Sequence, residues 1–327
     1  MGDDGLKAYT PANTAQKMFD FFRFLRDSPL GLGARLLLGI FYARRQQKLV
    51  DSWSARLQIA PLKLKNFLPQ RDASSTLFIL GSGESVESLS PKNFAHIADH
   101  VSIGINAWPL HPFVADVYAF EPFDVQSDQY IQLFDTVLHE ARFLEKSPEL
   151  LLFRPQRNLD ADRYLSIPDH LRKKAHLYGR FVPLSANLAS LLGEIRSLHS
   201  LKKLHALGQA LVMDLGATVI RMVSLGMLMG YRDIVLLGVD LNGGKYFWEK
   251  NPSRLSDRGL TSFSPGHNRV VHETMTRESK AFVLTEVLAE LQRLMSQQGK
   301  TLWVGSGSSL LAEFLPVYGW ESDKSHS

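Results

Sequence analysis

Short apolar runs alternate with amphipathic stretches along most of the chain. Largely apolar runs of four to six residues are typical of strands buried on both faces of a sheet. Five such strands are expected: Leu77 to Leu80, Val101 to Ile105, Asp116 to Phe120, Ile234 to Val239 and Thr301 to Val304. Apolar residues at helical spacing predict helices over Ser85 to Ala98, Gly216 to Gly230 and Ser279 to Gln298. Strands that alternate with helices predict an α/β fold with a doubly wound, Rossmann-like parallel sheet.

Polar residues and glycines gather where these strands end. In a doubly wound sheet, ligands bind at the carboxyl ends of the strands, near the point where strand order reverses. Turn chemistry is the alternative explanation for each position taken singly, but together the positions predict a nucleotide site. They are Gly81, Ser82 and Gly83 after the first strand, Asn106 after the second, Glu121 after the third, Asp240 to Asn242 after the fourth, and Gly305 to Ser309 after the last.

The turn from Gly81 to Gly83 lacks the complete dinucleotide-binding fingerprint. No third glycine follows at the expected position, and no Walker sequence occurs in the chain. A nicotinamide or ATP site is therefore disfavoured. A cradle of backbone amides and helix N-termini, which suits a phosphate group, remains.

Composition narrows the class of protein further. With 327 residues, 45% of them hydrophobic and 21% charged, the chain is expected to form one large domain with an appendage. The absence of cysteine excludes disulfides, thiolate nucleophiles and cysteine zinc sites, and is compatible with a reducing cytoplasm. The formal charge of +4 does not by itself indicate a nucleic-acid partner, and none is expected.

A required metal ion is not expected either. Metal-dependent nucleotide-sugar transferases need a carboxylate pair near the phosphate, and no suitable turn carries one. Asp240 is a single carboxylate, better suited to hydrogen bonding than to chelating magnesium. His267 and His272 are five residues apart, and no third zinc ligand is evident.

The N-terminal segment is rich in positive charge. From Lys17 to Lys48 there are seven basic residues and only two acidic ones, and the apolar block Leu36 to Ala43 is far shorter than the roughly 20 residues that span a bilayer. The acidic start and the lack of a cleavage site argue against a secretory signal. Two readings stay open: helices packed on the body or on another subunit, or a basic amphipathic anchor at the inner face of the cell membrane.

These features suggest an organisation along the chain. Residues 1–74 are expected to be the helical extension and residues 75–320 the nucleotide-binding domain, for which the family resemblance given below implies a nucleotide sugar. Residues 241–273, with Gly243-Gly244 and several aromatic residues, are expected to form a lid over the donor, and 321–327 a disordered tail. A structural loop is the alternative to the lid. The protein is expected to be cytoplasmic, peripheral to the membrane, and a homo-oligomer.

Several segments carry a resemblance to bacterial sialyltransferases of glycosyltransferase family 42. The resemblance covers roughly residues 75 to 316. It implies a single-domain variant of the GT-A architecture, and an enzyme that transfers sialic acid from CMP-sialic acid with inversion and without a metal ion. The segments that resemble the family are "LFILGSGESV", "IGINAW", "VYAFEPF", "ATVIRMVSLGMLMGYRDIVLLGVDL", "GHNRVVHETMTRESKAF" and "SSLLAEF".

The resemblance also implies roles for individual residues. His272, with Thr276 four residues on, matches the family's catalytic base; His267 is the competitor. Thr218 would lie near the donor phosphate or sugar carboxylate, and Tyr246 would approximate a tyrosine that donates to the departing phosphate. The implied donor-binding set is Gly81, Ser82, Gly83, Asn106, Glu121, Pro122, Gly238, Asp240, Leu241, Asn242, Ser308 and Ser309.

Departures from the family leave the transferred sugar open. Asn242 stands where the first tyrosine of the donor pocket would be, and Leu215 where an arginine would be. Lys245 or Arg254 could supply positive charge instead. The carrier is expected to be CMP, while the cargo could be sialic acid, another nonulosonic acid or Kdo.

The expected function is an inverting transfer to a hydroxyl of a cell-surface glycan or glycolipid, as in lipopolysaccharide or capsule synthesis. Residues 123 to 205 are expected to provide acceptor contacts or an oligomer interface. Two alternatives remain: a noncatalytic relative that binds CMP or a glycan without turnover, and a transferase of the flagellin-glycosylating type.

Overall fold

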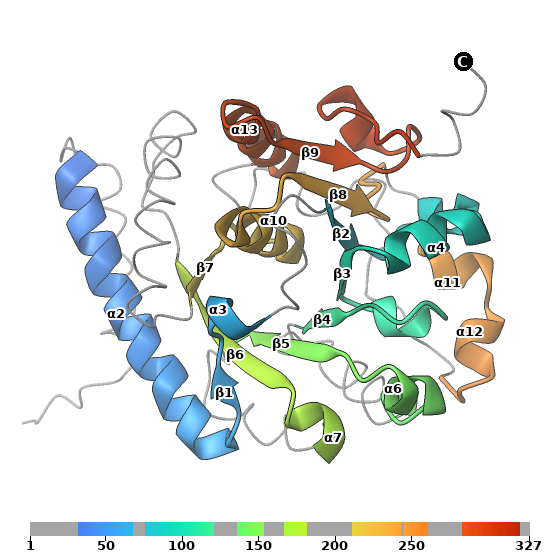
Figure 1. Ribbon diagram of the computed structural model, residues 1–327, viewed down its shortest axis with the longest axis horizontal. Helices are drawn as coiled ribbons and strands as arrows, with labels where there is room; N and C mark the ends of the chain where they lie inside the picture. The colour runs from blue at the N-terminus through green and yellow to red at the C-terminus, as the bar shows by residue number, and fades with distance from the viewer. Residues whose placement is uncertain are drawn as a thin grey trace, which may run out of the picture.

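A computed structural model of the chain describes residues 32–67, 76–120, 136–153, 167–181, 211–242, 245–260 and 283–320. In this part of the chain, nine strands form a parallel sheet (Figure 1). Their order is β1-β6-β5-β4-β3-β2-β8-β9, and β7 also pairs with β6. The bounds are β1 Ala60–Pro61, β2 Thr76–Leu80, β3 Val101–Ile105, β4 Val117–Phe120, β5 Glu149–Phe153, β6 Ala175–Phe181, β7 Leu211–Met213, β8 Asp233–Leu237 and β9 Thr301–Val304.

The strand order reverses between β2 and β8. From β2 the chain builds the sheet outward through β3, β4, β5 and β6, and it then returns to place β8 on the other side of β2. The register sets Leu80 of β2 opposite Gly104 of β3 and Leu237 of β8. The predicted doubly wound α/β fold is therefore confirmed, and the strand-order reversal, where sheets of this kind bind ligands, lies at the ends of β2 and β8.

Central strands were predictable because both of their faces are buried. All five residues of β2 and all five of β3 are buried, and the only polar residues in them are the small Thr76 and Ser102. The predicted strands agree with β2, β3, β4, β8 and β9 within one or two residues. The fourth ends two residues early, at Leu237, because Gly238 turns the chain with a φ of +61°.

Residues 123 to 205 contribute more to the core than expected. This segment was expected to serve the acceptor or an oligomer contact, yet β5 and β6 form part of the central sheet. β6 was not predicted as a strand, because His176, Gly179 and Arg180 interrupt its apolar pattern.

Helices cover the two faces of the sheet near β2. α10 (Thr218–Met229) and α13 (Leu284–Ser296) share one face, where α10 contacts β2 and β3 and packs against α13. α4 (Pro91–Ala98) and the chain after β9 cover the other, where His96, Tyr318 and Trp320 surround Phe78. These helices and the chain after β9 therefore cover both faces of the strands at the strand-order reversal.

The helix predicted over Ser85 to Ala98 is two separate helices. A short 3-10 helix, η1 (Glu84–Ser88), is followed by α4, which begins after Ser90. Ser90 caps α4 by accepting from the backbone N–H of Asn93, and Pro91 occupies the first helical position. These start signals explain the break.

The described part of the N-terminal extension packs on the sheet. α2 (Leu32–Leu57) lies beside β6 and β7, and β1 pairs with β6 through Ala60 opposite His176 (Figure 1). Short helix α3 (Leu64–Phe67) follows β1 and places Phe67 against His176. The boundary expected near residue 74 is thus corrected, because the described residues before it share the sheet and core of the larger domain. None of the described helices combines the length and apolar character needed to cross a membrane.

The turns after β2 and β8 touch through their backbones. Gly81 N–H donates to Leu237 O at 2.6 Å, and Gly83 N–H donates to Gly238 O at 2.8 Å. A Cβ at Gly81 would lie 2.5 Å from Gly238 O, and one at Gly238 would lie 2.4 Å from Gly81 O. Both glycines are therefore required for the backbones of these two turns to come into contact.

Gly238→Ala should destabilise the protein by on the order of 3 kcal/mol, because the new Cβ clashes with Gly81 O and the left-handed φ strains alanine. Gly299→Ala is the control, since Gly299 also has a positive φ of +67° but nothing lies within 4 Å of its added Cβ. It should lose only about 1 kcal/mol. Urea unfolding measures both, and equal losses would show that close contact with Gly81 is unimportant.

Candidate functional site

Three loops meet at the carboxyl ends of β2, β8 and β9. The first two touch through Gly81 and Gly238, as described above. The third joins them because Leu310 N–H donates to Asp240 O at 3.0 Å and Ser309 Oγ donates to Val239 O at 2.8 Å. Asn242 Nδ2 adds a contact to Ser308 O at 3.2 Å. Ten of the residues expected at the site are brought together in this way: Gly81, Ser82, Gly83, Gly238, Asp240, Leu241, Asn242, Tyr246, Ser308 and Ser309.

The Asp240 carboxylate is engaged within the protein. It is buried, its Oδ2 accepts from Ser85 N–H at 3.0 Å, and its Oδ1 accepts from Ser85 Oγ at 2.5 Å. Leu241 follows with a φ of +60°, a strained conformation for a side chain of this size. Asp240 therefore holds η1 against the turn that follows β8.

Ser82 differs from its neighbours in its hydrogen bonding. The residue is only 6% exposed, and its Oγ has no hydrogen-bond partner among the described residues. A buried hydroxyl without a partner costs stability, so such groups are uncommon. Ser82 Oγ is therefore an unsatisfied polar atom between the two glycines of the β2 turn.

Tyr246 reaches the same turn from another part of the chain. It forms a β-bridge with Gly83 and opens the short helix α11 (Phe247–Lys250), whose Phe247 N–H donates to Ser82 O. The Tyr246 ring stacks on Trp248 at 4.5 Å with an interplanar angle of 4°. Burial, and secondarily the charge of Glu249, raise the pKa of Tyr246 to about 12. At neutral pH the phenol keeps its proton and can donate it.

Residues 245–260 are firmly seated on the body. Phe247 and Trp248 are buried in the core. Three ion pairs extend the attachment through α11 and α12 (Ser253–Ser256): Lys250 to Glu84 at 3.1 Å, Arg254 to Glu87 at 2.7 Å, and Arg258 to Glu140 at 2.5 Å. Of the expected lid, this stretch packs against the body of the protein, while residues 243–244 and the part from residue 261 onward lie outside the described residues.

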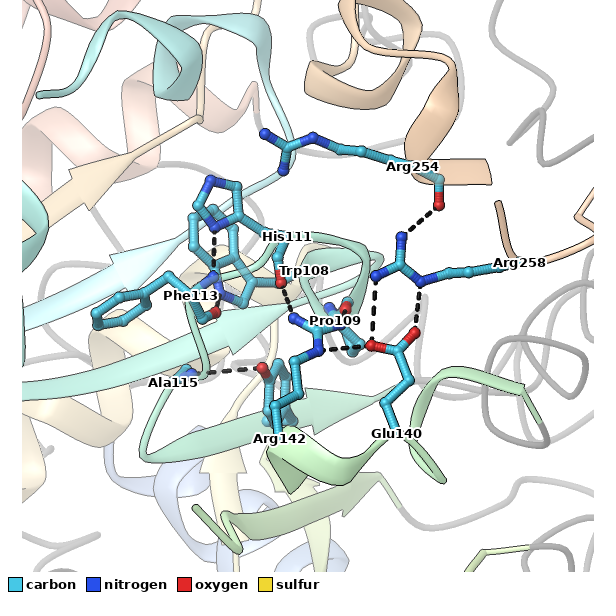
Figure 2. A network of polar contacts seen from close by, with 10 residues as sticks. Trp108, Pro109, His111, Phe113, Ala115, Glu140, Arg142, Arg254 and Arg258 are labelled. Carbon is cyan, nitrogen blue, oxygen red and sulfur yellow. Dashed lines mark hydrogen bonds and ion pairs between the residues drawn. The ribbon is translucent and has the colours of Figure 1, made fainter. Parts of the chain in front are cut away.

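Arg258 leads into a network around Glu140 and His111. Figure 2 shows the guanidinium groups of Arg142 and Arg258 meeting at the Glu140 carboxylate. Burial alone would raise the pKa of Glu140, but hydrogen bonds and charge from Arg258 and Arg142 lower it overall. Arg142 also donates to the carbonyls of Pro109 and His111, so the network ties α12 to the β3–β4 connection.

His111 is buried beneath this network in aromatic surroundings. Its ring stacks on Trp108 at 4.4 Å and meets Phe247 edge to face at 5.4 Å. Its Nδ1 accepts from Phe113 N–H at 3.1 Å, which requires that nitrogen to be unprotonated. Burial, followed by the charges of Arg254 and Arg142, lowers the pKa of His111 to about 3. The imidazole is therefore a neutral structural group at physiological pH.

Thr218 begins α10 and is bonded to a buried arginine. Arg221 Nη2 donates to Thr218 Oγ1 at 2.8 Å, and Arg221 Nη1 donates to Asp214 Oδ1 at 2.9 Å. Asp214 also accepts from Gly216 N–H, which shapes the turn between β7 and α10. A positive charge thus lies under the first turn of α10, close to a hydroxyl expected to face the donor.

The remaining expected residues fall at the strand ends or outside the description. Asn106 follows β3 directly and has a φ of +55°, a left-handed conformation that asparagine tolerates better than most residues. Lys245 is exposed. The residues that lie outside the described ranges are Glu121, Pro122, His267, His272 and Thr276.

Sequence reasoning missed several residues that organise the site. Ser85, Arg221 and His111 all lie within expected elements or just after them, but each acts through a partner that only the fold supplies. Of these three residues, only Arg221 could have been recognised from the sequence, because an arginine inside a strongly apolar helix needs a partner. Among the described residues, no group of three potential metal-ligating side chains occurs.

Comparison with known proteins gives the following. No protein-family model matches the sequence, and no curated protein matches it. The chain is similar in structure to the sialyltransferase CstII from Campylobacter jejuni in complex with the substrate analogue CMP-3FNeuAc, at 15% identity and a TM-score of 0.42, covering 75% of this chain and 86% of that one. It is also similar to the sialyltransferase CST-II in complex with a trisaccharide acceptor and CMP, at 13% identity and a TM-score of 0.40, with the same coverage.

His111 should make stability depend on pH. Its pKa is about 3 when folded and near 6.5 when unfolded, so its contribution is complete above pH 6.5 and is lost as the pH falls toward 3. Between pH 7 and pH 5 this one group should cost about 2 kcal/mol of unfolding free energy.

His111→Asn keeps an acceptor for Phe113 N–H but does not ionise in this range. Urea unfolding at both pH values should give a pH-dependent loss smaller by about 2 kcal/mol than in the wild type. The same loss in both proteins would mean that another group titrates.

Proposed function

We propose that this chain is an inverting, metal-independent glycosyltransferase that moves a sialic-acid-like sugar, a nonulosonic acid or Kdo, from a CMP-activated donor to a glycan hydroxyl. One observation carries the proposal. The polar segments that resemble the donor-binding segments of family 42 end three different strands, and they are hydrogen-bonded to one another at the strand-order reversal. That edge is where doubly wound sheets bind nucleotides.

The donor phosphate is assigned to groups that donate hydrogen bonds. Ser82 has an unsatisfied hydroxyl, and Tyr246 carries its phenolic proton at neutral pH. Thr218 Oγ1 accepts from Arg221, which places a guanidinium charge beside this hydroxyl. Donors that are already fixed in place stabilise the negative charge that grows on the leaving CMP, since they need little reorganisation.

His272 is assigned as the general base, with His267 as the alternative. The acceptor oxygen attacks C2 of the donor, the bond from C2 to the phosphate oxygen breaks, and the histidine takes the acceptor's proton. An imidazole suits this step because it titrates close to neutral pH. His111 is not a candidate, because its Nδ1 is bonded within the protein and its pKa is about 3.

A noncatalytic CMP-binding role is the second candidate. It is favoured by the engagement of Asp240 with Ser85 and by Asn242 in the position where the resemblance expects a tyrosine. A flagellin-type acceptor would leave the donor site as proposed. A measurement of turnover distinguishes the proposed enzyme from the noncatalytic role. A screen of acceptors distinguishes a glycan acceptor from a flagellin-type acceptor.

Ligand binding is tested by thermal shift with CMP, UDP and NAD. CMP at about 100 times its Kd should add nearly 3 kcal/mol of stability, whereas UDP and NAD should add none at the same concentration. Ser82→Ala should leave the unliganded melting temperature unchanged, because no protein bond is lost, but should reduce the CMP-induced shift.

Ser309→Ala is the matched control for this experiment. It removes hydrogen bonds to Val239 O and Leu311 N–H, so it should lower the unliganded melting temperature. Stabilisation by UDP or NAD but not by CMP would refute the donor assignment. An unchanged CMP shift in Ser82→Ala would remove Ser82 from the site.

Catalysis is tested by CMP release from CMP-sugars in the presence of glycan acceptors. His272→Ala should lower kcat by about a hundredfold or more, while CMP still raises the melting temperature, because general-base catalysis contributes roughly that factor. His267→Ala should retain activity. The opposite pattern would make His267 the base, and CMP binding without turnover in the wild type would favour the noncatalytic role.

A further inference from the structure

We propose that one face of α2 docks on an anionic membrane surface. The face consists of Phe41, Arg44, Arg45 and Lys48, referred to as the α2 stripe. These residues follow the spacing i, i+3, i+4, i+7, so they lie in a row on one side of the helix. All four are exposed, and Phe41 retains 68% of its accessible surface.

The opposite face of α2 fixes the direction in which the stripe points. Five residues of that face are buried: Ala43, Gln46, Val50, Trp53 and Leu57. Val50 and Gln46 lie against Gly179 of β6, and α2 runs along the periphery of the molecule (Figure 1). The core therefore holds the helix rigidly, and the stripe faces away from the sheet.

The charge of this region is entirely positive. From Ser28 to Val50 the sequence has four basic residues and no acidic one. The first acidic residue beyond it is Asp51, whose carboxylate accepts from Gln47 at 2.8 Å. Lipid phosphates are the complementary partner, because each basic residue near an anionic surface adds to binding.

Phe41 distinguishes a lipid surface from a purely ionic partner. A large aromatic ring that is mostly exposed is unfavourable in water, but it can enter the boundary between headgroups and acyl chains. The stripe spans seven residue steps, or about 10 Å of helix, so cations and ring can reach one flat surface together. The inference does not depend on the proposed enzymatic function.

Vesicle flotation of the full chain tests the proposal. The protein should float with vesicles of phosphatidylcholine containing 30% phosphatidylglycerol, remain unbound with phosphatidylcholine alone, and dissociate in 0.5 M NaCl because salt screens the charges. Arg44→Glu with Lys48→Glu should reduce binding to the anionic vesicles at least tenfold. Phe41→Ser, which keeps all three basic residues of the stripe, should reduce binding to the anionic vesicles by a smaller factor.

Lys92→Glu with Lys173→Glu is the matched control, since both lysines are exposed and the net charge changes equally. It should bind within twofold of the wild type. Equal binding by the stripe variant and the control, or no binding by the wild type, would overturn the proposal. So would a change of oligomeric state in the stripe variants without vesicle binding by the wild type, or capture of duplex nucleic acid in preference to the vesicles.

Discussion

The close backbone contact between Gly81 and Gly238 is the constraint on which the candidate site depends. The turns that follow the neighbouring strands β2 and β8 lie within hydrogen-bonding distance of each other. A side chain at Gly81 or at Gly238 would prevent this contact. The contact aligns Asp240 with Ser85 and leaves Gly83 able to pair with Tyr246. One steric requirement at the reversal point therefore positions polar groups that come from segments 155 residues apart.

Packing, more than charge, holds residues 245–260 in place. Burying Phe247 and Trp248 contributes about 2–3 kcal/mol each, whereas ion pairs of partly exposed groups contribute about 0–1 kcal/mol each. The ion pairs at Lys250, Arg254 and Arg258 therefore set direction and register more than strength. Lifting α11 would expose both aromatic rings to water.

The sequence predicted β2, β3, β4, β8 and β9 but not β6 and β7, for a physical reason. The predicted strands are largely apolar, whereas β6 mixes His176 and Arg180 with apolar residues, and β7 is only three residues long. Candidate residues at strand ends were also predictable, because parallel strands end at one edge. Their partners were not, since contacts such as Arg258 to Glu140 depend on tertiary register.

The same tertiary contacts explain why the candidate site is rigid. Asp240, Ser309 and Arg221 form hydrogen bonds within the protein that hold the strand ends and the start of α10 in position. A preorganised site needs such a supporting set, because hydrogen-bond donors that are already oriented stabilise developing charge at little reorganisation cost.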